Sequence, residues 1–136
     1  MNKNSLLIVL VMFIFVFGLQ IAEPAAAAGL KEIDHGSYNF TSCNILTNYK
    51  WTTYQKGANY VKMVEYYYFP QYKSKEYCYM YFQKVSATKL KVSEKIVTYY
   101  DNTHSTKNMK PFYEHTKLTA VKYYWKEFRP DVAAHP

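Results

Sequence analysis

The chain has 136 residues, of which 19% are aromatic, and a formal net charge of +7 at pH 7. This length is typical of a single domain. The sequence contains no G-x-S-x-G, H-E-x-x-H, P-loop or dinucleotide-binding motif, which argues against the enzyme classes that depend on them. We therefore expect a non-enzymatic protein with no catalytic residues and no cofactor.

Residues 1–28 have the organisation of a secretory signal peptide. A lysine near the start precedes an apolar run from Leu6 to Leu19, and an alanine run supplies an Ala-x-Ala cleavage site. The apolar run is shorter than the roughly 20 residues of a membrane-spanning helix. We expect cleavage before Gly29 and an extracellular, secreted domain of residues 29–136, with an uncut signal anchor as the alternative. Cleavage removes one lysine and one glutamate, so the net charge stays at +7.

The rest of the sequence is rich in Tyr, Val, Thr, Phe and Trp, which favour β-strands, and turn-forming residues interrupt it at short intervals. Six strands joined mostly by short turns predict an all-β fold, a small antiparallel β-sandwich or barrel. A short helix is compatible with residues 29–34 or with the polar stretch 101–111. The predicted strands cover residues 37–44, 48–55, 60–69, 75–85, 88–100 and 112–127.

Period-two alternation assigns faces to two of these strands. In 77–82 the face of Cys78 also carries Met80 and Phe82, and we expect it to lie in the core. In 89–96 apolar residues share one face, interrupted by Glu94. Strand 60–69 does not resolve into two faces, and a β-bulge near Val64 is one explanation. The side chains expected on the outer face are Tyr77, Tyr79, Tyr81, Lys89, Lys91 and Lys95.

Cys43 and Cys78 are the two cysteines of the chain. An even number of cysteines in an exported domain predicts one disulfide bond, with two free buried thiols as the alternative. The bond would close a loop of about 36 residues and stabilise the fold by about 4 kcal/mol in the chain-entropy estimate. No histidine lies at ligand spacing from either cysteine, so we expect no metal site.

Aromatic rings beside ammonium groups suit ligands that carry sugars or anionic groups. We therefore interpret the expected outer face as a binding face for the cell envelope. Its partner would be an anionic polymer, a polysaccharide or a lipid surface, and a bacteriocin-like or antimicrobial action would be one consequence. The alternative is a cross-strand tyrosine ladder that only stabilises the sheet, with lysines that keep its outer side soluble.

Two other functions are compatible with the composition. A secreted inhibitor or immunity-type protein would use the tyrosines for a contact with another protein. A small secreted nuclease would need a carboxylate, a histidine and an arginine, which Glu114, His115 and Arg129 offer. Adjacent residues of a strand point to opposite faces, however, so Glu114 and His115 would not share a site. Nucleic acid is not the partner we expect for an exported protein.

Overall fold

The computed structural model describes residues 29–134, so the predicted signal peptide, residues 1–28, lies outside the described part of the chain. No helix among residues 29–134 is long and apolar enough to span a membrane. The strands are β2 (Lys31–Ser42), β3 (Ile45–Gln55), β4 (Tyr60–Phe69), β5 (Ser74–Ser86), β6 (Lys89–Tyr100), β7 (Thr103–Asn108) and β8 (Phe112–His115). A helical segment follows, composed of α1 (Ala120–Tyr123), the π-helix η2 (Tyr124–Phe128) and α2 (Arg129–Ala134).

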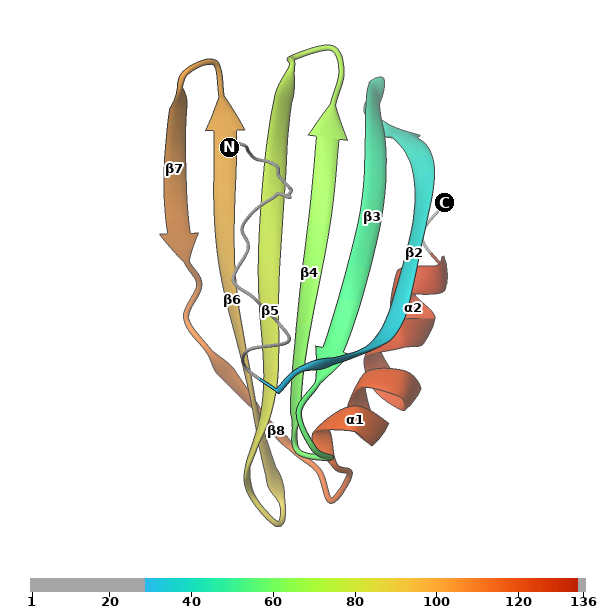
Figure 1. Ribbon diagram of the computed structural model, residues 1–136, viewed down its shortest axis with the longest axis vertical. Coiled ribbons are helices and arrows are strands. Elements are labelled where there is room, and N and C mark those ends of the chain that lie inside the picture. The colour runs from blue at the N-terminus through green and yellow to red at the C-terminus, as the bar shows by residue number, and fades with distance from the viewer. Residues whose placement is uncertain (1–28, 135–136) are drawn as a thin grey trace. The chain divides into compact units, whose positions relative to one another are not determined.

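The strands form one open sheet in the order β2-β3-β4-β5-β6-β7, and β8 pairs with β6 (Figure 1). The pairings from β3 onward are antiparallel. The all-β prediction is confirmed in this coarse sense, but the predicted sandwich or barrel is wrong, because the strands of residues 29–134 form a single sheet that does not close. The helical segment lies against the sheet instead and supplies the apolar partner that the core needs.

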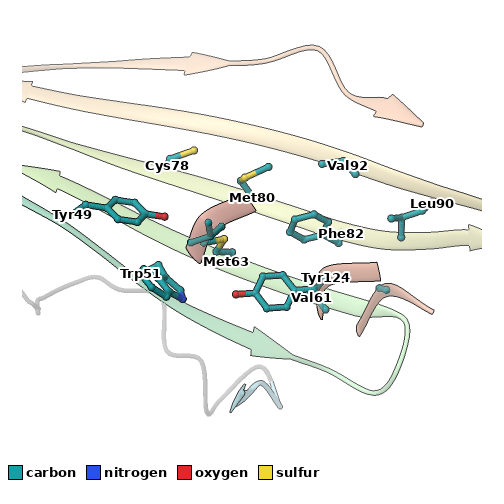
Figure 2. Close-up of a cluster of buried hydrophobic side chains, with 12 residues drawn as sticks. Tyr49, Trp51, Val61, Met63, Cys78, Met80, Phe82, Leu90, Val92 and Tyr124 are labelled. Carbon is teal, nitrogen blue, oxygen red and sulfur yellow. The ribbon is translucent and has the colours of Figure 1, made fainter. Parts of the chain in front are cut away.

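The core lies between one face of the sheet and the helical segment. Phe82 of β5 is fully buried, and its ring centroid lies 6.0 Å from that of Tyr124 and 5.1 Å from that of Phe128. The hydroxyl of Tyr124 forms a 2.7 Å hydrogen bond with Thr53 of β3. Figure 2 shows Tyr124 together with the buried side chains of the central strands, namely Tyr49, Trp51, Val61, Met63, Cys78, Met80, Phe82, Leu90 and Val92.

Residues 112–127 differ from the predicted strand, because only Phe112–His115 is extended. Thr119 caps the following helix by accepting a hydrogen bond from the backbone N–H of Lys122. Ala120 and Tyr124 are both fully buried, which is the i, i+4 spacing of one helix face. Aromatic residues with high strand propensity are therefore helical here, because the helix points them at the core.

Two features that the sequence left open, a short helix and a β-bulge near Val64, do not occur at the positions considered. The polar stretch 101–111 contains β7, which pairs with the edge of β6, and neither it nor residues 29–34 contains a helix. Strand β4 pairs in regular register with both neighbours through Val64, and the irregularity lies instead between Lys84 and Ser86 of β5. The Nζ of Lys84 points toward the helical side, where it donates to the carbonyl of Leu118 at 2.6 Å.

Candidate binding face

The sheet face opposite the helical segment brings the predicted tyrosines and lysines together. Cys78 and Phe82 are buried on the core side, so Tyr77, Tyr79 and Tyr81 point to the other side, as predicted. We call this surface the lysine–tyrosine face. On β3 to β6 it carries Lys50, Tyr54, Tyr60, Lys62, Tyr66, Tyr68, Lys75, Tyr77, Tyr79, Tyr81, Lys89, Lys91, Lys95 and Tyr99.

The antiparallel register places these side chains across the strands from one another. Tyr79 of β5 lies between Val64 of β4 and Lys95 of β6, and Lys91 lies opposite Gln83. Strands β5 and β6 pair through the turn after Ser86. This pairing places the three lysines predicted for the outer side on the same face as the three tyrosines.

Charge is sorted between the two faces of β3 to β6. Glu65 lies opposite Cys78, Glu76 opposite Tyr67, and Glu94 opposite Met80, so all three carboxylates of these strands lie on the helical side. The lysine–tyrosine face has no carboxylate on these strands. Apart from Lys84, which bonds to carbonyls on the helical side, the lysines of these strands lie on the opposite face. That face therefore carries a net positive charge on these strands.

The ammonium groups lie over aromatic rings. The Nζ of Lys50 is 5.0 Å from the ring centroid of Tyr66, and that of Lys95 is 5.3 Å from the centroid of Tyr79. Each such contact contributes about 0.5–1 kcal/mol at an exposed site. Further cation–π contacts join Lys62 to Tyr79 and Tyr81, Lys75 to Tyr99, and Lys89 to Tyr113 of β8.

Partial burial changes the acid–base properties of this face. Burial raises the pKa of Tyr66 to about 12, and burial beside other tyrosines raises the pKa of Tyr77 further. Burial also lowers the pKa of Lys50 and of Lys75. The phenol groups of Tyr66 and Tyr77 therefore remain protonated at neutral pH.

Sequence reasoning missed part of this face. Lys50 and Lys75 belong to it, as do Tyr99 and Tyr113, and none of them was among the predicted site residues. Once Trp51 is known to be buried, Lys50 is expected on the outer face, because neighbouring residues of a strand point to opposite faces. The pairing of β8 with β6, which adds Tyr113, has no such local signal.

The predicted disulfide between Cys43 and Cys78 is absent, and both cysteines are free. Cys43 is exposed in the β2–β3 turn, whereas Cys78 lies opposite Glu65, which itself lies opposite Trp51. Trp51 comes eight residues after Cys43, about 27 Å of extended strand. A disulfide needs Cα atoms within about 7 Å, so this fold keeps the two thiols apart.

A buried polar cluster surrounds Cys78 on the helical side of the sheet. Glu65 accepts hydrogen bonds from the hydroxyls of Tyr49 and Tyr67, and the Cys78 thiol donates to Glu94 over 2.8 Å. Burial raises the pKa of Glu65 and of Cys78. A buried thiol with a raised pKa is a poor nucleophile, so this cluster contributes packing rather than reactivity.

The residues compared above with a nuclease site are separated. Glu114 lies opposite Leu90 and His115 opposite Lys89, so they point to opposite faces of the sheet. Arg129 forms an ion pair with Asp34 of β2. Within residues 29–134, no group of three His, Cys, Asp or Glu side chains is arranged to hold a metal ion.

The chain matches no protein-family model, no curated protein and no solved structure.

Proposed function

We propose that the chain is an exported, non-enzymatic protein that binds anionic polymers of the cell envelope through the lysine–tyrosine face. The observation that carries the proposal is the charge sorting of β3 to β6, which leaves one face with lysines and no carboxylate. Such a surface concentrates a polyanion and gains affinity from the counterions that the polyanion releases.

The geometry favours an anionic ligand over a neutral sugar. A sugar ring stacks on an open aromatic face, but ammonium groups lie over the rings of Tyr66, Tyr79 and Tyr81. The face is also unlike a protein contact surface, because lysines are depleted in the centre of such interfaces. The inhibitor or immunity-type alternative therefore has less support than anion binding.

A charge-reversal pair tests the proposal. The double variant Lys89→Glu/Lys91→Glu places two carboxylates on the lysine–tyrosine face, where we expect affinity for immobilised dextran sulfate to fall more than tenfold. The matched control is Lys122→Glu/Lys126→Glu, which changes the net charge equally at two exposed positions of the helical segment. Both variants and the parent are titrated over a range of salt concentrations.

The two variants give opposite results under the proposal. The face variant binds weakly with a flattened salt dependence, and the control stays close to the parent. Equal loss in both variants means that only net charge matters, and it refutes a dedicated face. Absence of binding by the parent protein at low salt refutes polyanion binding itself.

A further inference from the structure

The lysines of the lysine–tyrosine face are distributed one to a row. A row here means the residues that lie directly opposite one another across β3 to β6. Along β5, each second residue from Lys75 to Gln83 defines a row, and the last row is that of Ser86, beyond the irregularity that follows Lys84. The row of Lys91 extends over β4 to β6, and the row of Lys89 over β5 and β6 alone. Within the bounds of these strands, each row contains a single lysine. In order, the rows contain Lys75, Lys50, Lys95, Lys62, Lys91 and Lys89.

This arrangement gives the face a charge repeat along the strand direction. Two residues of antiparallel strand advance about 6.8 Å, so one cation occurs at roughly that interval over six rows. Lys50 comes from β3 and Lys95 from β6, but their ammonium groups lie over Tyr66 of β4 and Tyr79 of β5. The cations of these outer strands therefore turn toward the central strands β4 and β5.

A linear phosphodiester with a short polyol linker has a matching repeat. Three extended backbone bonds span about 3.6 Å, so the six bonds that join successive phosphorus atoms through a three-carbon linker span about 7 Å. Such a chain, lying along the strands, brings one phosphate to each row. Lys62 is only 5% exposed, so in its row it supplies charge rather than direct contact.

The structure also favours this ligand over nucleic acids and lipid bilayers. Nucleobases need free ring faces to stack on, and cations lie over the rings of Tyr66, Tyr79 and Tyr99. A bilayer presents phosphates in a plane, whereas strand twist rotates neighbouring strands by roughly 20–25° and prevents a flat surface from meeting all the rows. A flexible thread follows the twisted strands.

We propose that the lysine–tyrosine face takes a linear polyol-phosphate chain that runs along β4 and β5 with one phosphate to each row. This inference rests on the proposed function, since it specifies the anionic polymer that the same face binds. The inference predicts the number of phosphates that the face contacts, because the rows end at Lys75 and at Lys89.

Synthetic glycerol-phosphate oligomers of increasing length test the ladder. Affinity per molecule should rise with each added phosphate and level off at about six, while the salt slope steepens by about 0.7 for each phosphate contacted. Removing an end row by Lys89→Gln should shorten the levelling-off length by one phosphate. Removing a middle row by Lys95→Gln should lower affinity about tenfold and leave that length unchanged. Lys107→Gln, an exposed position of β7, is the control and should change neither.

The outcomes distinguish this inference from the proposed function. If dextran sulfate binds but glycerol-phosphate affinity rises without levelling off, or Lys89→Gln leaves the length unchanged, the ladder is refuted and polyanion binding stands. Equal or tighter binding of a single-stranded oligonucleotide with six phosphates, or of phosphatidylglycerol vesicles, also overturns the polyol-phosphate assignment. If no polyanion binds, both proposals fail.

Discussion

Replacing Asp34 by asparagine removes the charge at the centre of a cluster that joins β2 to the helical segment. The carboxylate accepts hydrogen bonds from the indole of Trp51 at 3.0 Å, from the hydroxyl of Tyr124 at 2.7 Å and from the guanidinium of Arg129. The Asp34 side chain is 8% exposed and that of Arg129 is 24% exposed. An asparagine of the same shape keeps one acceptor oxygen and loses the ion pair.

The expected loss of stability is about 2–3 kcal/mol. Removing one partner of a fully buried ion pair costs about 3–5 kcal/mol, because the other charge remains buried. Arg129 is partly exposed and can reach water, and it also lies 4.8 Å from the ring centroid of Trp51. The loss should therefore lie near the value for hydrogen bonds to charged groups, about 1.5–3 kcal/mol.

Urea denaturation followed by tryptophan fluorescence measures this loss, because Trp51 is itself part of the cluster. Asp101→Asn, in an exposed turn with a positive φ of 56° that asparagine tolerates, is the matched control. We expect the control to stay within about 0.5 kcal/mol of the parent, as surface substitutions usually do. A variant at Asp34 that is no less stable than the control would refute the reasoning.

The same carboxylate gives a pH dependence of known sign. Burial works against the charge, but hydrogen bonds from Arg129, Tyr124 and Trp51 outweigh it, so the pKa of Asp34 lies below its ordinary value of 3.8. Below pH 3.8 the unfolded chain takes up this proton before the folded protein does. The parent should therefore lose stability as the pH falls below that value and through the folded pKa, and Asp34→Asn should lack this component.

Three further predictions concern other parts of the sheet. Burial raises the pKa of Glu65 above 4.5, so ionisation of this carboxyl destabilises the fold as the pH rises from that value. The variant Glu65→Gln should therefore raise the free energy of unfolding in urea at pH 7 and reduce its dependence on pH. A lower free energy of unfolding at pH 7 would contradict this prediction. Tyr79→Ala removes the ring beneath two ammonium groups, and calorimetric titration with dextran sulfate should show at least tenfold weaker binding while circular dichroism stays unchanged, an unfolded variant being evidence for a purely structural tyrosine. Alkylation of the native protein should label Cys43 and spare Cys78, as read by mass spectrometry, and two protected thiols would indicate a bond that this fold does not contain.

Much of the sheet could be predicted from local patterns, because period-two alternation and turn residues act within a few positions of the chain. Strand β5 is the best case, since Phe82 and Tyr81 are sorted correctly by parity alone. The helical segment was not predicted, because tyrosines such as Tyr124 have strand propensity. The helical state of Tyr124 depends on packing against Phe82, which is distant in sequence. The prediction of a disulfide was wrong because an even number of cysteines carries no information about the distance between Cys43 and Cys78 in the fold.

The candidate face was predicted in part, for a related reason. Parity locates lysines on a strand, but only the register between strands places Lys50, Lys95 and Tyr79 in common rows. The absence of carboxylates from this face could not be predicted, because the sequence alone did not resolve the faces of 60–69. The register assigns the faces of that strand, because it places Glu65 opposite Cys78 and Lys62 opposite Tyr81.

The same charge sorting also bears on the purely structural alternative for the lysines. A one-residue slip of β4 would move Glu65 to the outer face and Lys62 into the core, so the charges help to specify register. That role needs a charged residue on each strand, but it does not require one lysine in every row. A lysine that only keeps the surface soluble can be moved to a neighbouring outward position without consequence. Exchanging Lys95 with Ser93 keeps the composition, the face and the net charge but empties one row and doubles the next. Solubility and fold should survive this exchange under either explanation, whereas the tight fit of a six-phosphate oligomer should be lost only if the regular spacing of cations is used for binding.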